Sequence, residues 1–280
     1  MKRALGCAGL LCCCVACGAP LMKLPSAPGT PAADAADALT EATAACRAVT
    51  SMTADIAASG TVGGQRLRGH ILAGLAAPAS ARLEAVAPAG PPIFIFTSKD
   101  RDATLLLPRD DRVVEHGAPA EILEAVTGVP VDAAALRETL AGCPPLASAA
   151  GGHALGADWR LLQIGRADVY LRRDPKLARW QVAAIVHHAA GSGGDPGRVA
   201  LQGPRGGDWR AEYRDFQSGL PRTIHLASAD RARFDLSLTL SQVALGETLG
   251  ADVFRVDVPR SAERISVDDL RHARPGVRED

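Results

Sequence analysis

The chain has 280 residues, of which 47% are hydrophobic, 22% charged and 4% aromatic, so it carries enough apolar side chains to build the core of a folded protein. Its 31 basic and 31 acidic residues cancel, and no run of Lys or Arg creates a local positive field, which argues against nucleic-acid binding. The longest apolar stretch lies within residues 4–22 and is too short, and too rich in Cys and Gly, for a membrane-spanning helix.

The N-terminus has the pattern of an export signal. Lys2 and Arg3 precede an apolar stretch over residues 4–16, the order typical of a secretory signal peptide. The segment ends in Val-Ala-Cys-Gly around Cys17, which resembles a bacterial lipobox, although Cys14 stands where a lipobox usually has Leu. The resemblance implies a signal peptide over 1–16 and attachment of lipid to the Cys17 sulfur. The alternative is an ordinary secretory signal without lipidation.

The next segments predict a tether and then a helix. Residues 17–33 include four prolines and almost no charge, which predicts an extended, unpacked tether between a lipid anchor and a domain. From residue 34 to about 52 the prolines stop, and Leu39, Thr43 and Cys46 recur at three- and four-residue spacing. We therefore predict one amphipathic helix at the start of a single domain that spans residues 34–280.

The rest of the chain is dominated by strand patterns. Short segments bounded by Gly, Pro or Asp predict strands over 66–73, 81–87, 93–98, 103–107, 112–115, 159–165, 167–172, 179–187, 209–216, 222–228, 231–243 and 253–258. Two segments with helical spacing, 119–126 and 132–141, interrupt them, and a loop follows over 144–158. This order predicts a mainly β (α+β) fold, a strongly curved antiparallel sheet or open barrel that encloses the helices.

Two cysteines, Cys46 and Cys143, remain after the first 17 residues. Outside the cytoplasm oxidised pairing is the usual state, so we predict a disulfide between them, worth roughly 4 kcal/mol for a loop of this length. Two separate thiols are the alternative, because pairing geometry cannot be read from sequence.

The sequence contains none of the familiar catalytic or cofactor signatures, so we predict a protein that is not an enzyme and has no metal or cofactor. His187 and His188 are adjacent on a predicted strand and would point to opposite faces, which prevents them from sharing one metal ion. The glycine-rich residues 191–197 lack the Lys and the following helix of a phosphate loop, and they are typical of a flexible hairpin connection.

The element order, together with the segments 82–90, 120–130 and 136–142, resembles the LolA/LolB-like family of lipoprotein-localisation proteins over about residues 35–145. The resemblance implies an incompletely closed antiparallel β-barrel of about eleven strands, with helices covering its mouth. It also implies an apolar cavity that holds acyl chains of lipoproteins or another lipid. The expected protein is a monomer, lipid-anchored at the periplasmic face of the outer membrane and supplied by a periplasmic carrier protein.

Within this resemblance we assign two groups of site residues. The loop of Pro88, Ala89, Gly90, Pro91 and Pro92 stands where one branch of the family touches the membrane through an exposed leucine, a position that Ala89 occupies here. The inward-facing apolar side chains of the sheet and of the two central helices are the candidates to line the cavity: Leu83, Ile93, Phe94, Phe96, Leu105, Leu107, Ile122, Val126, Leu136, Leu236, Leu238 and Leu240. The alternative is that these side chains fill the interior, and that the protein is a non-catalytic structural or assembly lipoprotein that uses the same fold as a scaffold.

Overall fold

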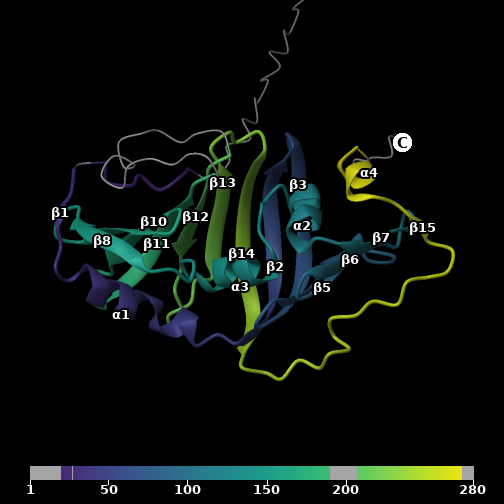
Figure 1. The fold of residues 1–280 in the computed structure, drawn as a ribbon, viewed down its shortest axis with the longest axis horizontal. Coiled ribbons are helices and arrows are strands. Elements are labelled where there is room, and N and C mark those ends of the chain that lie inside the picture. The colour runs from purple at the N-terminus through teal and green to yellow at the C-terminus, as the bar shows by residue number, and fades with distance from the viewer. Residues whose placement is uncertain (1–19, 27, 190–206, 273–280) are drawn as a thin grey trace, which may run out of the picture.

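A computed structural model describes residues 20–26, 28–189 and 207–272, whose strands form one strongly curved sheet (Figure 1). The helices are α1 (Ala35–Arg47), α2 (Pro119–Thr127), α3 (Ala133–Ala141) and α4 (Val267–His272). The strands are β1 (Thr30–Pro31), β2 (Ser51–Val62), β3 (Gln65–Ala76), β4 (Ser80–Val86), β5 (Phe94–Lys99), β6 (Asp102–Leu107), β7 (Arg112–Gly117), β8 (Ala149–Ala154), β9 (Trp159–Ile164), β10 (Ala167–Arg173), β11 (Trp180–His187), β12 (Trp209–Arg214), β13 (Thr223–Ser228), β14 (Phe234–Leu245) and β15 (Glu263–Arg264).

The sheet runs in the order β1-β8-β9-β10-β11-β12-β13-β14-β2-β3-β4-β5-β6-β7-β15, so it has two separate edges and is not a closed barrel. Neighbouring strands are antiparallel, except that β15 pairs with β7 in parallel. At its centre β2 and β3 form a long hairpin, turned by Gly63 and Gly64, which both adopt the positive φ that a two-residue turn of this kind requires. This mainly β, incompletely closed architecture with internal helices confirms the predicted fold class.

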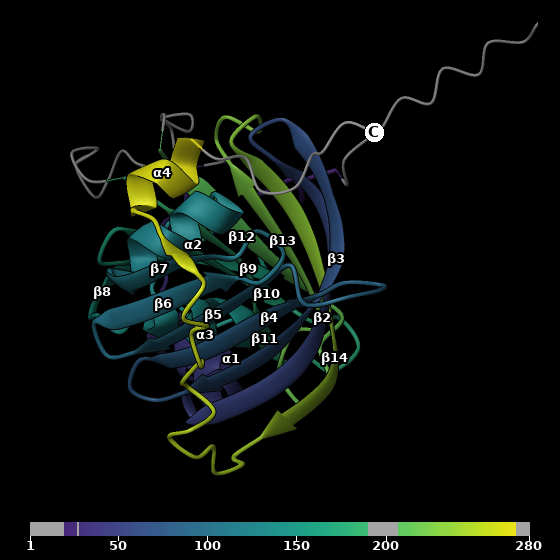
Figure 2. The same cartoon turned by 90° about the vertical axis from the view of Figure 1, so that its right-hand side faces the viewer.

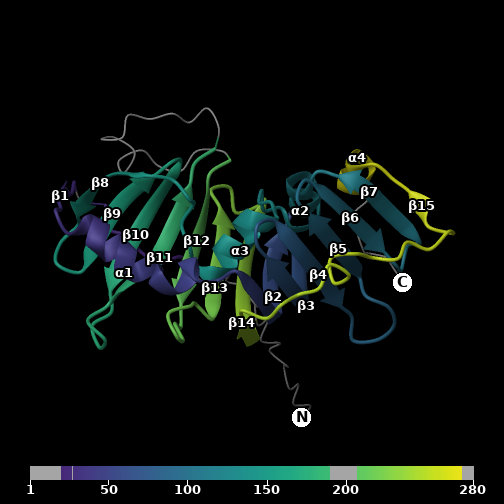
Figure 3. The same ribbon diagram turned by 60° about the horizontal axis from the view of Figure 1, so that its bottom comes forward.

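Strand alternation divides the sheet into an inner and an outer face. In β14, Phe234, Leu236, Leu238 and Leu240 are buried, while the residues between them are polar. The inner face carries the helices: α1 contacts β8 to β11, α3 contacts β3 and β4, and α2 contacts β6. Figure 2 shows the sheet curving around α2 and α3, and Figure 3 shows α1, α3 and α2 following one another along the same side of it.

The disulfide between Cys46 and Cys143 is present, which confirms the predicted pairing. Cys46 lies in the last turn of α1, and Cys143 follows Gly142, which ends α3 in a left-handed conformation. At the other end of α3, Asp132 accepts a hydrogen bond from the backbone N–H of Ala135 at 2.8 Å and so caps the helix. The bridge therefore fixes the C-terminal end of α3 to the opening helix.

Some predicted boundaries were wrong. The opening helix ends at Arg47 instead of near residue 52, and the long strand β2 follows in place of a connection. The predicted loop 144–158 contains the strand β8. The predicted strand 253–258 is an irregular arm, although its alternating side chains do pack on one side.

This C-terminal arm, residues 246–266, crosses the outer face of the sheet. Val256 and Val258 pack against Leu106 of β6 and Val113 of β7, and Arg82 of β4 donates to the carbonyl oxygen of Arg255 at 3.0 Å. The arm then pairs with the edge of β7 as β15, and α4 returns to the inner side to contact α2. Figure 2 shows this path in yellow.

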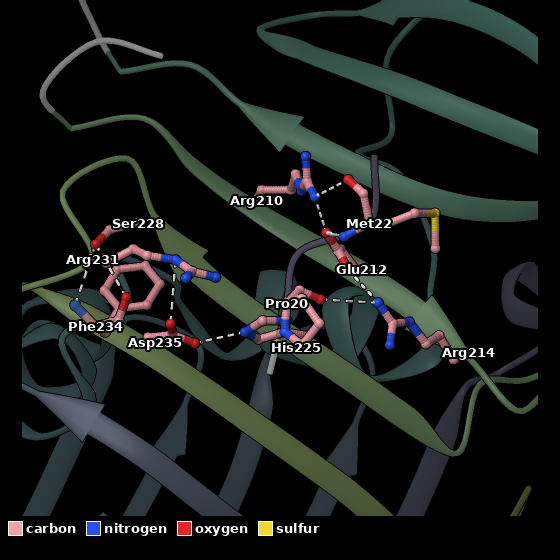
Figure 4. Close-up of polar contacts among 10 residues, drawn as sticks. All are labelled: Pro20, Met22, Arg210, Glu212, Arg214, His225, Ser228, Arg231, Phe234 and Asp235. Atoms are coloured by element: carbon pink, nitrogen blue, oxygen red, sulfur yellow. Dashed lines mark hydrogen bonds and ion pairs between the residues drawn. The ribbon is translucent and has the colours of Figure 1, made fainter. Parts of the chain in front are cut away.

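The described part of the N-terminal segment is packed against the sheet, unlike the unpacked tether that its composition predicts. Glu212 lies on the outer face of β12, is 0% exposed, and accepts a hydrogen bond from the backbone N–H of Met22 at 2.7 Å (Figure 4). Arg210 pairs with Glu212 and also donates to the Met22 carbonyl at 2.6 Å, and Arg214 donates to Glu212 at 3.1 Å. Further along, Leu24 packs on the outer face of β9 to β11, and β1 pairs with β8.

Candidate functional site

An apolar cavity of about 190 Å³ lies between the inner face of the sheet and the helices α2, α3 and α4. Its walls come from the centre of the sheet, with Ile56 of β2, Leu226 of β13 and Leu238 of β14, and from Leu123, Leu140 and Leu270 of the three helices. The wall is almost wholly hydrocarbon, so it favours an apolar ligand and offers a polar group few hydrogen-bond partners.

The structure divides the predicted lining residues into two groups. Phe96, Leu105, Ile122 and Leu240 belong to the packed core and are not among the residues that line the cavity. Phe96 and Leu105 pair across β5 and β6, away from the open space. The other eight line the cavity: Leu83, Ile93, Phe94, Leu107, Val126, Leu136, Leu236 and Leu238. Their contact with a ligand stays a prediction.

Several lining residues were missed from the sequence. Ile56 and Ala58 belong to β2, where alanine occurs at buried and at less buried positions, so the alternation gives a weak signal. Leu226 lies in a predicted strand, on the same face as its cross-strand partner Leu236, and could have been included. Leu270 comes from α4, a helix that the sequence did not predict.

The cavity opens at one side of the sheet. Leu67, Val86 and Ile93 line it and are nonetheless 43%, 38% and 38% exposed, so they form its mouth. The predicted membrane-touching loop, residues 88–92, connects β4 to β5 beside this mouth. Arg109 holds the loop by donating to the carbonyl oxygens of Ala89 at 3.0 Å and Pro91 at 3.2 Å. Contact between this loop and a membrane stays a prediction.

A second, polar cavity of about 560 Å³ lies on the other side of α3. Leu136 and Leu140 of this helix line the apolar cavity, whereas Ala135 and Glu138 line the polar one. Thr139 lines both, as does Val131 in the connection that precedes α3. Helix α3 is therefore a partition between an apolar and a polar space inside the curved sheet.

Charged and aromatic groups surround the polar cavity. Arg233 forms an ion pair with Glu124 at 3.1 Å, while Arg166 stands at the turn between β9 and β10. His187 stacks on Trp209 with ring centroids 3.9 Å apart, and burial lowers the pKa of its imidazole to about 4, so the ring is neutral at physiological pH. His187 and Trp209 both line the cavity and give it a flat aromatic wall.

The neighbouring His188 has different surroundings. Its two ring nitrogens each lie 3.2 Å from a carboxylate oxygen, one of Asp168 and one of Asp208. The hydrogen bond to Asp168 contributes most to raising the pKa of this imidazole, with Asp208 adding to it. The two histidines therefore have separate partners.

Within the described ranges, no group of three or more His, Cys, Asp or Glu side chains is arranged to hold a metal ion. No helix in the same part of the chain combines the length and the apolar character that crossing a membrane requires. The predicted signal peptide 1–16, the lipidation site Cys17 and the predicted loop 191–197 lie outside the described residues.

No protein-family model and no curated protein sequence matches this chain. Solved structures do match its fold. The LolA superfamily protein NE2245 from Nitrosomonas europaea is 12% identical, with a TM-score of 0.53, and the match covers 79% of this chain and 97% of that one. Two further matches have TM-scores below 0.5.

The first of these is a DUF1329 family protein from Desulfovibrio piger, 10% identical with a TM-score of 0.45, covering 80% of this chain and 98% of that chain. The second is the lipoprotein LppX from Mycobacterium tuberculosis, 12% identical with a TM-score of 0.33, covering 77% and 97%. The resemblance inferred from the sequence is thus confirmed at the level of the fold, and the chain has the LolA-like fold: a large, unclosed antiparallel sheet with helices in its hollow.

Proposed function

We propose that this protein binds acyl chains of lipoproteins in its apolar cavity and serves their localisation to the outer membrane. The observation that carries the proposal is a cavity with a hydrocarbon wall that opens through an apolar mouth, within a LolA-like fold. Because each buried methylene contributes about 0.8 kcal/mol, a short length of acyl chain in such a space gives useful affinity without any polar contact.

The size of the cavity suggests how a chain would be held. An apolar protein cavity of about 150 Å³ can bind benzene, so 190 Å³ accommodates the end of one acyl chain. The following methylenes would lie between Leu67, Val86 and Ile93 at the mouth. A longer buried stretch would require outward movement of α4, which contributes Leu270 to the wall.

The remaining parts of the proposal concern the placement of the protein. Residues 1–16 would be the signal peptide, residues 17–33 the lipidated segment with the lipid on Cys17, and residues 34–280 one domain. The protein would be a monomer on the periplasmic face of the outer membrane, where it receives cargo from a periplasmic carrier. The lipobox-like sequence at Cys17 supports the anchor, and the loop 88–92 beside the mouth would face the membrane.

The test is uptake of a fluorescent fatty acid by the full chain carrying Cys17→Ser, which removes only the proposed lipidation site. Ala85→Phe fills the cavity from β4, so we expect it to weaken uptake at least tenfold. The matched control is Ala157→Phe, at an exposed turn away from the cavity. If the parent chain takes up no fatty acid and contains no copurified lipid, the acyl-binding function is wrong and the scaffold function is favoured.

A further inference from the structure

The turn between β10 and β11 carries an exposed leucine among basic side chains. Leu177 is 63% exposed, and Lys176 and Arg179 close to it are exposed as well. Among the described residues neither of these two cations forms an ion pair. Arg173, at the end of β10, is also exposed, and its guanidinium reaches only the carbonyl oxygen of Ala178, at 3.4 Å. An apolar side chain surrounded by free cations is typical of protein elements that lie on a membrane surface.

The turn is ordered, so it presents Leu177 in one position. The Asp174 carboxylate accepts hydrogen bonds from the backbone N–H groups of Leu177 at 2.9 Å and Lys176 at 2.8 Å. These bonds lower the pKa of the Asp174 carboxyl, so it is ionised and holds the turn at neutral pH. The backbone N–H of Ala178 also donates to the Asp174 carbonyl oxygen, at 2.9 Å. The single carboxylate of the turn is therefore engaged by the backbone, while its exposed charged groups are positive.

The turn lies at the end of the sheet where the described N-terminal segment begins. Because β12 is antiparallel to β11, Arg214 at the end of β12 and the β10–β11 turn at the start of β11 are at the same end of these strands. Arg214 donates to the carbonyl oxygen of Pro20. Figures 2 and 3 show the β10–β11 turn and the loop 88–92 projecting from the same side of the curved sheet. A flat surface could therefore meet the turn, the loop and a lipid on Cys17 together.

We propose that the β10–β11 turn binds the surface of a bilayer that contains anionic lipids, with Leu177 between the headgroups and Arg173, Lys176 and Arg179 beside the phosphates. This contact goes beyond acyl-chain binding and does not depend on it. Each basic side chain near an anionic membrane strengthens binding about fivefold, and salt weakens the effect. Three cations and one leucine bind reversibly, so the turn would orient a tethered domain instead of replacing the tether.

The surroundings of the turn favour a membrane over other acidic partners. Single-stranded nucleic acids stack their bases on free aromatic rings, but the two rings nearest the turn each have an arginine over one face. Arg172 lies over Trp159 at 5.9 Å and Arg160 over Trp180 at 4.7 Å. A stable protein partner would bury about 800 Å² on each side, which is more than residues 174–179 can offer. A headgroup layer deforms around a small tip and needs no matching shape.

The experiment measures flotation of the full chain carrying Cys17→Ser with vesicles of phosphatidylcholine alone, or of phosphatidylcholine and phosphatidylglycerol at about 2:1. We expect the parent chain to bind the anionic vesicles more tightly, and less so as salt is raised. Leu177→Ser should weaken this binding at least threefold, and Lys176→Gln with Arg179→Gln at least tenfold. Residues 1–16 are present in every variant, so any contribution they make cancels in the comparison.

Matched controls change the same kinds of side chain elsewhere. Leu146→Ser replaces a leucine that is 77% exposed in the connection before β8. Lys99→Gln with Arg101→Gln removes two exposed cations from the β5–β6 turn, at the opposite end of β5 from the loop 88–92. Both controls should bind like the parent chain. Lysine acetylation gives a second measurement in the parent chain: anionic vesicles should slow the reaction of Lys176 at least threefold and leave that of Lys99 unchanged.

The possible results separate this proposal from acyl binding. If the turn variants bind like the parent chain or no worse than the controls, or if Lys176 reacts equally fast with and without vesicles, the turn is not a membrane contact. Equal binding to both kinds of vesicle, unaffected by salt, would also overturn the proposal. Fatty-acid uptake should persist in the turn variants, because the turn lies outside the apolar cavity. A variant that loses uptake as well is misfolded, and the acetylation of Lys176 in the parent chain then decides.

Discussion

Two adjacent histidines show how strongly local surroundings change the pKa of an imidazole. His187 stacks on Trp209 inside the sheet, and its pKa is lowered to about 4 by burial. His188 lies between the carboxylates of Asp168 and Asp208, and its pKa is raised. The same side chain therefore resists protonation at one position and retains its proton at the next.

At His187 we predict a loss of stability in acid. The folded state binds this proton more weakly than the unfolded chain, so stability is complete above the unfolded pKa of 6.5 and falls as pH decreases towards 4. The full loss is about 3 kcal/mol, at about 1.4 kcal/mol per pKa unit. Urea unfolding at a series of pH values measures it, and His187→Phe, which keeps the ring against Trp209, should flatten the curve over this range. An unchanged slope in that variant would exclude His187 as the cause.

At His188 the stability of the folded state changes with pH in the opposite direction. The folded state holds the proton more tightly, so the stabilisation is present below pH 6.5 and is lost as pH rises through the raised folded pKa. We expect the unfolding free energy of the parent chain to decrease above pH 6.5, and the decrease to disappear in His188→Gln. His70, which is exposed and pairs with Asp55, supplies the control variant His70→Gln, in which the decrease should persist. If His70→Gln abolishes it instead, the assignment to His188 is wrong.

The helices and strands that the sequence predicted correctly are those with strong local signals. The helices α2 and α3 have clear caps at Asp132, Gly128 and Gly142, and their predicted bounds agree with the structure to within a residue or two. The strand β2 was missed because alanine stands both at buried positions (Ala54 and Ala58) and at the less buried Ala57 between them, so its alternation shows little contrast.

The arm at residues 253–258 was predicted as a strand but is irregular in the structure. Val256 and Val258 alternate with polar residues because one side packs against the outer face of the sheet, and this pattern does not require backbone pairing. Alternation reports which side of an extended chain is buried, so it cannot by itself separate a strand from an irregular strap.

The disulfide holds α3, the element that separates the two cavities. We predict that the double variant Cys46→Ser with Cys143→Ser loses about 4 kcal/mol of unfolding free energy, because the bridge joins positions 97 residues apart. Fatty-acid uptake should also weaken, since α3 carries Leu136 and Leu140 of the apolar wall. Denaturant unfolding and the uptake assay measure both effects, with Ser51→Ala as a control for a small polar change in a nearby strand. A loss below 1 kcal/mol would mean that packing alone positions α3.

Across the whole molecule, local sequence patterns could predict the curved sheet but not which side chains line the cavities inside it. The polar cavity combines side chains from α2, α3, the β9–β10 turn, β11, β12 and the β13–β14 turn, which together span more than a hundred residues of the chain. No local pattern relates Glu138 to Arg166, because both line this cavity only through the way the sheet curves around α3. The packing of residues 20–24 on the outer face was likewise invisible in a Pro- and Ala-rich composition.

This packed N-terminal segment limits the distance between the domain and a lipid anchor at Cys17. Only Gly18 and Ala19 separate Cys17 from Pro20, whose carbonyl oxygen accepts from Arg214, so the anchor would lie within about 10 Å of the outer face of β12. If residues 18–29 were free, they could span about 40 Å. If Cys17 carries the proposed lipid, the contacts of Glu212 with Met22 and Arg210 would hold the domain close to the membrane.

We predict that Glu212→Ala releases this segment. The variant removes the acceptor of the Met22 N–H and leaves Arg210 without its carboxylate, at a cost of about 3 kcal/mol. Hydrogen exchange at the Met22 amide and trypsin cleavage after Lys23 should each become at least tenfold faster, whereas Glu41→Ala on α1 should change neither. Amides of β14 serve as the internal reference: if they accelerate to the same extent, the variant unfolds the whole domain, and if the Met22 amide keeps its parent rate, Glu212 does not hold the segment.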